Sequence, residues 1–278
     1  MAPHRSVGIA VALIACIACR GPEPGPTLDL PTRPHDAPGG HELASALRSL
    51  DLEAREDAIH REVARGNVPG WLRRLVPVAL RVEVDGTEHR VTFWTTPDYL
   101  AVGSEDDYLL IPLTPQTAQR IADLAGASLP TPSMVDAIWR AARVRLDPTP
   151  IPPSTLMTTV PVFEDHHRKV LRQRRRATRP PGTLVAGHKK DVVLTAELMT
   201  HPASVAIYGW HYLDGSHIQP LYLGHTNRWV DYSHGIRLVD DSVTVDGEPM
   251  ALSDVLRNTE WSRLFSDGGP IEPARYPR

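Results

Sequence analysis

The chain has 278 residues, of which 41% are hydrophobic, so it is long enough to bury a sizeable core. Its formal net charge of −3 is small for this length and excludes a strong overall field that would recruit nucleic acid or an anionic membrane, so any electrostatic specificity must be local. Both cysteines, Cys16 and Cys19, precede Gly21, which excludes a disulfide, a cysteine-ligated zinc ion and a cysteine nucleophile from the remainder of the chain.

The first fifteen residues have the pattern of an export signal. A short basic start, MAPHR, precedes the apolar run SVGIAVALIA. This run is shorter than the roughly 20 residues that a membrane-spanning helix needs, and it is typical of a signal-peptide core. We therefore predict a signal peptide over residues 1–15.

The stretch Leu13-Ile14-Ala15-Cys16 resembles the bacterial lipobox, in which aliphatic and small residues precede the cysteine that is acylated. The resemblance covers this leader only. It implies that Cys16 carries the lipid, such as palmitate, and that acyl chains anchor the exported protein to a membrane of the cell envelope or periplasm. Cys19 is the alternative, although its third preceding residue is Cys16 rather than an aliphatic residue.

The next segment is rich in proline and glycine. Residues 21–40 hold six prolines and four glycines, which prevent helix and disfavour sheet. We predict a disordered tether over residues 16–40 and one globular domain over 41–278. If that domain has an internal boundary, the proline-rich stretch 146–161 is where we expect it.

The first part of the domain shows helical spacing and then strand alternation. Apolar residues recur at helical spacing over 41–64, and VALRVEV and HRVTFWT flank Asp85-Gly86 as expected for a β-hairpin. We expect further elements in this order: strands at 99–102 and 108–113, and helices at 115–125 and 132–144.

A basic segment follows the proline-rich stretch. Seven Lys and Arg residues lie between Arg168 and Arg179, in a predicted helix that ends before Pro180-Pro181. This helix is either a solvated surface or a contact for an anionic envelope polymer or phospholipid headgroups.

The last hundred residues alternate strands and turns. We predict strands at 192–198, 204–212, 218–225, 228–232, 235–239 and 242–245, and a final helix at 251–265. Because strands and helices segregate rather than alternate regularly, the fold class is α+β, with a mainly antiparallel sheet and flanking helices.

Histidines supply the strongest functional signal in this region. Eight of the thirteen histidines lie between His166 and His234, and histidine exchanges protons or binds metal near neutral pH. The stretch WVDYSHGIRLV also gathers Asp231, His234 and Arg237 around a predicted turn. We select His234, Asp231 and His211 as catalytic candidates, with His234 oriented by Asp231.

Substrate-binding candidates flank these residues. Arg237 offers bidentate recognition of a carboxylate or phosphate, and His188, Lys189 and Lys190 could hold an anionic group. Trp210 ends an aromatic strand and suits a pocket wall. The remaining candidate is Gln219, at the start of the next strand.

Several hydrolase classes can be weighed against these residues. Papain-like peptidases need a cysteine that the domain lacks, and no Gly-x-Ser-x-Gly elbow is present for a Ser-His-Asp hydrolase. Ser233 adjoins His234, and neighbours on an extended chain point to opposite faces, so Ser233 is a poor nucleophile for that histidine.

Zinc remains an alternative to a metal-free site. Ser233-His234-Gly235 with Asp241 loosely resembles the ligands of D-alanyl-D-alanine carboxypeptidase-type zinc peptidases, but no histidine follows His234 as that pattern requires. A different zinc set could come from His211, His225 and His234. Our main expectation involves no cofactor.

The sequence thus predicts a lipid-anchored envelope lipoprotein with a cysteine-independent, histidine-rich hydrolase site for an envelope substrate such as a cell-wall polymer. Nucleic acid is not an expected partner of an exported chain. The alternative is a non-catalytic envelope-binding or structural lipoprotein.

Overall fold

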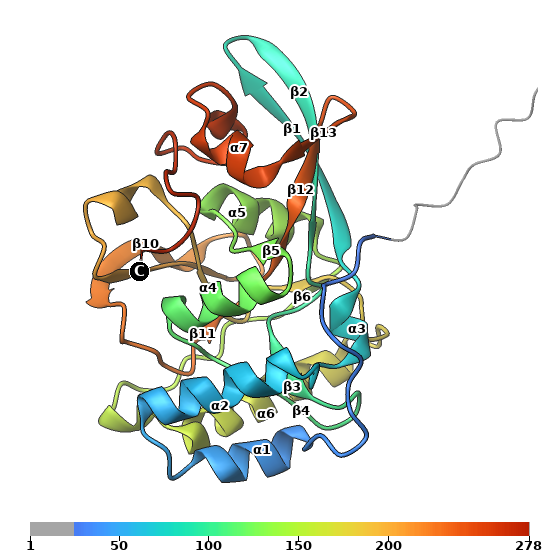
Figure 1. Cartoon of the computed structure of the whole chain (residues 1–278), viewed down its shortest axis with the longest axis vertical. Helices are drawn as coiled ribbons and strands as arrows, with labels where there is room; N and C mark the ends of the chain where they lie inside the picture. Colours follow the sequence, from blue (N-terminus) through green and yellow to red (C-terminus); the bar gives the residue numbers. More distant parts are fainter. Residues whose placement is uncertain (1–24, 278) are drawn as a thin grey trace, which may run out of the picture.

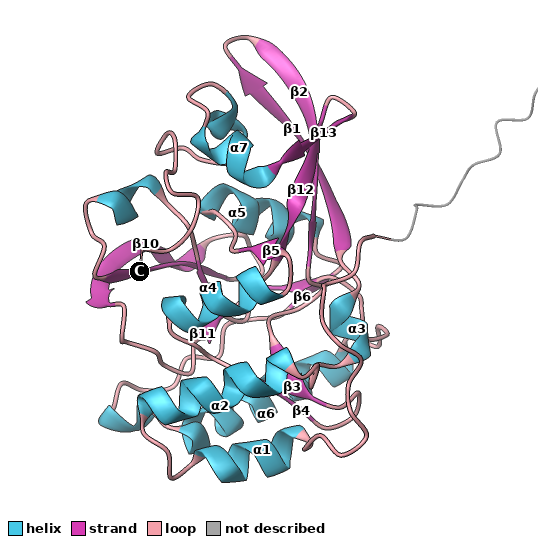
Figure 2. Ribbon diagram, viewed as in Figure 1, coloured by secondary structure: helices cyan, strands magenta, loops and turns pink. Residues whose placement is uncertain are grey.

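A computed structural model describes residues 25–277 of the chain. The predicted signal peptide and the lipidation candidates Cys16 and Cys19 lie outside the described residues. Within residues 25–277, seven α-helices and thirteen strands form an α+β fold with mainly antiparallel pairing, which confirms the predicted fold class (Figures 1 and 2).

Two principal sheets organise the molecule. The first contains β1 (Val76–Val84), β2 (Thr87–Thr95), β12 (Val239–Val245) and β13 (Glu248–Ala251), with β5 (Ala127–Ser128) paired to β12. The second has the order β10 (His217–Thr226), β9 (Ser204–His211), β8 (Lys190–Val192) and β11 (His234–Gly235). Two small pairs complete the strands: β3 (Ala101–Gly103) with β4 (Tyr108–Leu110), and β6 (Val144–Arg145) with β7 (Val185–Ala186).

The helices lie at three levels in Figure 1. At the bottom are α1 (Gly40–Leu47), α2 (Leu52–Ala64) and α6 (Val160–Arg176), with the short α3 (Gly70–Arg73) at the right. Across the middle lie α4 (Pro115–Leu124) and α5 (Pro132–Ala141), and α7 (Leu252–Arg257) lies beside the first sheet. Short 3-10 turns occur at Thr155–Thr158, Ala196–Met199 and Trp261–Leu264.

Local sequence signals explain the clearest elements. Asp85 and Gly86 both have positive φ angles, of 50° and 79°, as the tight turn between β1 and β2 requires. Thr114 and Thr131 cap α4 and α5 by accepting a hydrogen bond from a backbone N–H of the first turn, and proline follows each cap. The predicted hairpin and these two helices are confirmed.

The predicted tether needs a correction in its second half. Residues 25–39 pack against the domain: the backbone N–H of Leu28 donates to Arg73 at 2.9 Å, and the Leu28 side chain is only 4% exposed. Arg33 donates to Asn67 at 2.8 Å and to the carbonyl of Ala37 at 2.6 Å. Proline and glycine do exclude regular secondary structure from this segment, as predicted. The contacts nevertheless hold its backbone in one irregular conformation against the domain, so it is not a disordered tether.

Other boundaries also differ from the sequence prediction. The strand predicted at 192–198 ends at Val192 and is followed by a 3-10 turn, and no strand forms at 228–232. The final helix predicted at 251–265 stops at Arg257, because Asn258 is extended and its side chain accepts from the backbone of Glu260 and Trp261. No helix of residues 25–277 is long and apolar enough to cross a bilayer.

Candidate functional site

Strand β8 directs consecutive side chains to opposite faces of the second sheet. Lys190 pairs with His234 on β11, and Asp191 pairs with Tyr208 on β9. Because side chains alternate along a strand, Lys190 and His234 share one face while Asp191 and Tyr208 share the other. The parallel β8–β11 pair therefore brings the predicted turn at 231–234 next to the predicted segment 188–190.

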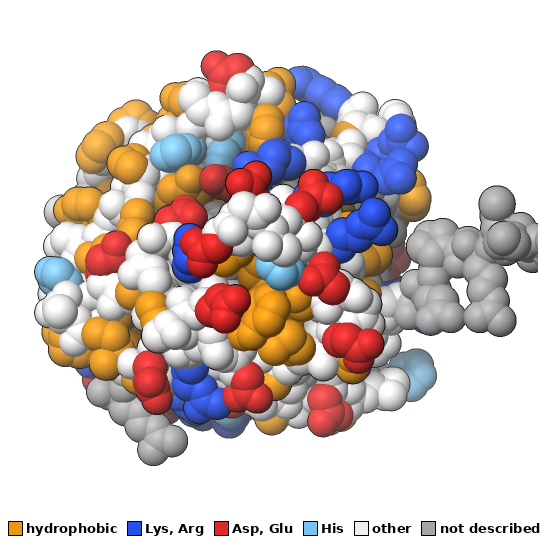
Figure 3. Space-filling view, turned by 90° about the horizontal axis from the view of Figure 1, so that it is seen from above, with side chains coloured by type: hydrophobic (Ala, Val, Ile, Leu, Met, Phe, Trp, Pro, Cys, Tyr) orange, Lys and Arg blue, Asp and Glu red, His pale blue; other side chains and the backbone are white. Residues whose placement is uncertain are grey.

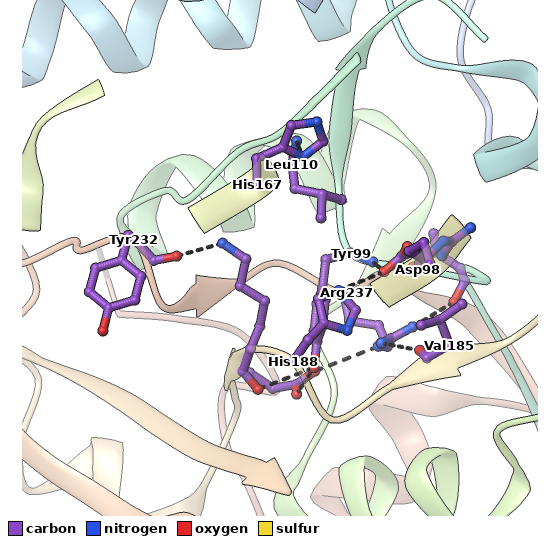
Figure 4. A network of polar contacts seen from close by, with 12 residues as sticks. Asp98, Tyr99, Leu110, His167, Val185, His188, Tyr232 and Arg237 are labelled. Atoms are coloured by element: carbon purple, nitrogen blue, oxygen red, sulfur yellow. Dashed lines mark hydrogen bonds and ion pairs between the residues drawn. The ribbon is translucent and has the colours of Figure 1, made fainter. Parts of the chain in front are cut away.

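Ionisable side chains from α6, from the loop after β2, from β8 and the two residues before it, and from the segment 231–237 lie around this pair (Figure 4). All are buried except Arg174, whose side chain is 13% exposed. We call this group the polar layer. It consists of Asp98, Tyr99, His166, His167, Arg174, His188, Lys189, Asp191, Asp231, His234 and Arg237.

One end of the polar layer joins a carboxylate to two basic side chains. Oδ1 of Asp98 lies 3.2 Å from Nε2 of His188, and Arg174 pairs with the other carboxylate oxygen. Burial alone would raise the pKa of Asp98, but Arg174 and His188 together bring it well below its usual value. Burial lowers the pKa of His188 despite Asp98, which favours a neutral imidazole at neutral pH.

A second buried group surrounds Arg237. Its guanidinium donates to the carbonyls of Thr96 and Val185, both at 2.9 Å, and lies 4.2 Å from the centre of the Tyr99 ring. The Tyr99 hydroxyl donates to Asp191 at 2.7 Å, and burial raises the pKa of Asp191 to about 6. The structure thus places Arg237 in internal contacts, with 1% exposure, rather than at a surface open to an anion.

Lys189 occupies the centre of the polar layer. Its ammonium donates to the carbonyl of Tyr232 at 2.5 Å, and its side chain is fully buried. Burial lowers the pKa of Lys189 to about 7, although Asp231 and Asp98 oppose this shift. Lys189 therefore exchanges its proton near neutral pH, as a general acid or base must.

The turn at 231–234 is held by its aspartate. The Asp231 carboxylate accepts hydrogen bonds from the backbone N–H and hydroxyl of Ser233, at 2.7 and 2.5 Å, and from the Trp229 indole at 3.3 Å. The His234 ring is not hydrogen-bonded to Asp231, so the expected orientation of His234 by that carboxylate is corrected. Burial lowers the pKa of His234 to about 4, so its imidazole is neutral.

The predicted residue His211 lies outside the polar layer. Its Nε2 lies 3.0 Å from Asp136 of α5, which also accepts a hydrogen bond from Tyr208, and its ring stacks on Trp139. His211 thus forms a separate histidine–carboxylate pair against α5. The structure brings His188, Lys189, Asp231 and His234 together but does not add His211 to them.

The remaining predicted residues lie at the edge of the polar layer. The Lys190 ammonium is 5.1 Å from the Trp210 ring centre, and Trp210 is buried. His225 stacks on Trp229 at 4.9 Å. Gln219 is the exception: its side chain donates to the carbonyl of Pro220 in β10 and, within residues 25–277, forms no hydrogen bond to the polar layer.

The alternative zinc ligands do not form one group. Across residues 25–277, no three His, Cys, Asp or Glu side chains are arranged to hold a metal ion. His211 faces Asp136 whereas His225 stacks on Trp229, so the set His211, His225 and His234 is not assembled.

Several polar atoms of the polar layer have no hydrogen-bond partner among the described residues. These are Nδ1 of His166, both ring nitrogens of His188 and His234, Oδ1 of Asp191 and Nε of Arg237. Some of these atoms still take part in ion pairs: Nε2 of His188 lies 3.2 Å from Oδ1 of Asp98, and Nε of Arg237 lies 3.6 Å from Oδ1 of Asp191. Neither contact has the geometry of a hydrogen bond. Leaving a buried polar atom without any partner generally costs about 1–3 kcal/mol, and a concentration of such atoms beside groups with shifted pKa values is typical of functional sites.

Sequence reasoning missed part of the polar layer. The predicted strand at 99–102 begins at Tyr99 and leaves Asp98 unassigned, and Arg174 is predicted only as part of a basic helix. The available signal is weak: Asp98 and Tyr99 follow Pro97, shortly after the predicted strand 89–95.

A surface cleft adjoins the polar layer. It has a volume of about 520 Å³ and lies between α1, β4 and α6. Its lining includes His167 and Arg174 of the polar layer, together with Tyr108, Glu164 and Arg168. Because Arg174 lines the cleft and pairs with Asp98, this side chain connects the cleft to the Asp98–His188 pair.

No known protein family matches this chain, and comparisons with curated proteins and with solved structures found no match either. The polar layer and the leader are therefore the features of this chain that indicate a function.

Proposed function

We propose that this protein is an exported lipoprotein, anchored through Cys16, whose domain hydrolyses an envelope substrate by cysteine-independent acid–base chemistry. The observation that supports this best is the polar layer, in which buried ring nitrogens of His166, His188 and His234 have neither a hydrogen bond nor an ion pair among the described residues. A layer that served stability alone would be expected to pair these atoms or replace them with apolar side chains.

The pKa directions suggest the roles. A neutral imidazole is the form that accepts a proton, and burial lowers the pKa of both His188 and His234. Lys189, with a pKa of about 7, is suited to give up a proton to a leaving group. We assign general-base chemistry to His188 or His234 and general-acid chemistry to Lys189.

The cleft is the proposed route to these groups. Arg174 lines the cleft and pairs with Asp98, which in turn contacts His188. A substrate with an anionic group bound near Arg174 would compete for the Asp98 contact and open a path towards His188. The envelope location of that substrate follows from the lipobox resemblance of the leader.

An activity screen on envelope fragments tests the proposal. The wild-type protein is compared with His188→Ala, His234→Ala and Lys189→Met, and with His201→Ala as the control. His201 is exposed, and within residues 25–277 its side chain hydrogen-bonds only to Thr200 and to the carbonyl of Glu197. We expect turnover to fall at least a hundredfold in Lys189→Met and in one histidine variant, as general acid–base catalysis contributes about 10²–10⁴-fold. Equal turnover in all five proteins would refute the assignment.

A non-catalytic envelope-binding lipoprotein is the second candidate. It is favoured by the complete burial of His188 and His234, both 0% exposed, which leaves no reacting group at the surface in this conformation. Envelope fragments that bind the wild-type protein and are recovered chemically unchanged would support this alternative.

A further inference from the structure

The described chain begins beside a hollow on the surface. Gly25 lines this hollow, whose volume is about 660 Å³, together with the apolar side chains of Trp71 and Leu184. Arg74 and Arg143 also line it, and both are exposed. The chain therefore leaves the domain at an apolar hollow bordered by arginines.

The C-terminal end of α6 extends this positive region. Pro181 lines both the hollow and the cleft, and Arg175 and Arg179 line the cleft next to it. Arg176, at the end of α6, is exposed as well. In Figure 3, most visible Lys and Arg side chains gather on the right, the side on which the described chain starts in Figure 1.

These arginines differ from the ion-paired basic residues of α6. Arg168 and Lys169 pair with Asp165, and Arg174 pairs with Asp98. By contrast, the exposed arginines at the hollow and at the end of α6 have no ion-pair partner within residues 25–277, which is also true of Arg172 on α6. We call the arginines at the hollow and at the end of α6 the basic surface: Arg74, Arg143, Arg175, Arg176 and Arg179.

The position of Gly25 limits how far the basic surface can stand from a lipid anchor. Because residues 25–39 pack on the domain, only eight residues lie between Cys16 and Gly25. The nine Cα–Cα steps from Cys16 to Gly25 span at most about 30 Å when fully extended. A lipid on Cys16 would thus keep the basic surface close to the membrane.

We propose that the basic surface docks on the anionic phospholipid headgroups of the membrane that holds the anchor. This inference rests on the anchoring part of the proposed function. Unpaired arginines are attracted to a negative lipid surface, and the attraction acts only within about 10 Å of it at moderate salt. Lipid anchors commonly need such a second, basic signal for stable attachment, and Trp71 in the hollow suits the headgroup region.

Vesicle binding tests this surface without the anchor. The full chain carrying Cys16→Ser and Cys19→Ser is mixed with phosphatidylcholine vesicles with and without phosphatidylglycerol. We expect binding only to vesicles that contain phosphatidylglycerol, and weaker binding at higher salt. Adding Arg74→Gln, Arg143→Gln, Arg176→Gln and Arg179→Gln is expected to lower the partition coefficient about a hundredfold or more.

A control removes the same charge elsewhere. Arg81, Arg257, Arg263 and Arg275 are each ion-paired to an acidic residue outside α6. Changing these four to Gln is expected to leave vesicle binding within a few-fold of the parent. Equal losses in the two variants would overturn the proposal, because net charge rather than the basic surface would then control binding.

Two further results would overturn the proposal. One is equal binding to vesicles with and without phosphatidylglycerol, and the other is binding to a soluble anionic polymer with no binding to vesicles.

Melting curves verify that each variant is folded. If the four-site variant unfolds, Arg176→Gln with Arg179→Gln is expected to lower binding about tenfold or more. Because the test protein has no cysteine, failure of palmitate labelling in the wild-type chain would refute the anchor and leave the vesicle result unaffected.

Discussion

Nε2 of His188 lies 3.2 Å from Oδ1 of Asp98 in the interior of the protein, and Arg174 binds the other oxygen of the same carboxylate. Asp98 follows β2, His188 precedes β8 and Arg174 belongs to α6. The carboxylate therefore connects three segments that are distant in sequence. Since its pKa stays low despite burial, Asp98 is ionised at neutral pH and holds α6 against the second sheet.

Replacing Asp98 by Asn should destabilise the protein. Arg174 would keep its charge in a largely buried place without its partner, and breaking such a pair costs about 3–5 kcal/mol. Because the folded pKa of Asp98 is depressed, its contribution is fully present above the unfolded pKa of about 4 and is lost as pH falls further. Urea unfolding at pH 7 and pH 3 measures both effects.

An exposed ion pair provides the control for this substitution. Arg81 and Glu88 lie 2.7 Å apart on the β1–β2 hairpin, and both are more than half exposed. Glu88→Gln should hardly change the free energy of unfolding, since exposed pairs contribute little. A similar small loss in Asp98→Asn would mean that the buried carboxylate does not hold the three segments together.

Replacing Lys189 by Met should change how stability depends on pH. The folded pKa of Lys189 is about 7, below its unfolded value of about 10.4. Between these values the unfolded chain binds a proton that the folded protein does not, so wild-type stability should rise with pH. Lys189→Met should remove most of the rise between pH 7 and 9.5, while Lys190 retains part because burial also lowers its pKa.

The half-buried Lys169 is the matched control for Lys189. It pairs with Asp165 at 3.0 Å on the surface of α6. Lys169→Met should preserve the wild-type rise of stability with pH. Unfolding curves with the same slope against pH for the wild-type protein and Lys189→Met would contradict a lowered pKa at Lys189.

Two similar turns allow a test of the 231–234 segment. Asp231 accepts from the N–H and hydroxyl of Ser233, and Asp214 accepts in the same way from Ser216, at 2.9 and 2.7 Å. Asp231 is buried and also binds Trp229, whereas Asp214 is exposed. Asp231→Ala leaves buried donors unpaired and should cost about 2–4 kcal/mol in chemical denaturation.

The same substitution at Asp214 separates burial from turn geometry. Water can replace the Asp214 carboxylate, so Asp214→Ala should lower stability much less than Asp231→Ala. If the two variants lose the same stability, the contribution of Asp231 comes from the turn alone and not from its position in the polar layer.

Local signals made much of the fold predictable. The Asp85-Gly86 turn, the threonine-proline starts of α4 and α5, and the alternation in β1 and β2 each act within a few residues. The packing of residues 25–39 could not be predicted in this way. It depends on partners such as Asn67 and Arg73 that a proline-rich composition does not indicate.

The candidate site was only partly predictable for the same reason. His188, Lys189, Asp231 and His234 belong to short polar segments that the sequence displays, and the β8–β11 pair joins those segments. Asp98 reaches them only through long-range packing. Arg237 looked like an anion-binding side chain because sequence cannot show that carbonyls of distant loops surround it.

The glycine before His188 should be intolerant of a side chain. Gly187 has a φ of +103°, and a Cβ there would lie 2.5 Å from the carbonyl oxygen of Leu146. Gly247 has a similar φ of +94°, but no atom lies within 4 Å of an added Cβ. Both Ala variants incur the cost of a left-handed backbone, about 1–2 kcal/mol. Only Gly187→Ala must also shift its own backbone or that of Leu146.

We expect Gly187→Ala to lose clearly more free energy of unfolding than Gly247→Ala and to reduce turnover in the proposed hydrolysis by displacing His188. Equal losses of stability in the two variants would show that the close approach to Leu146 does not fix the position of His188.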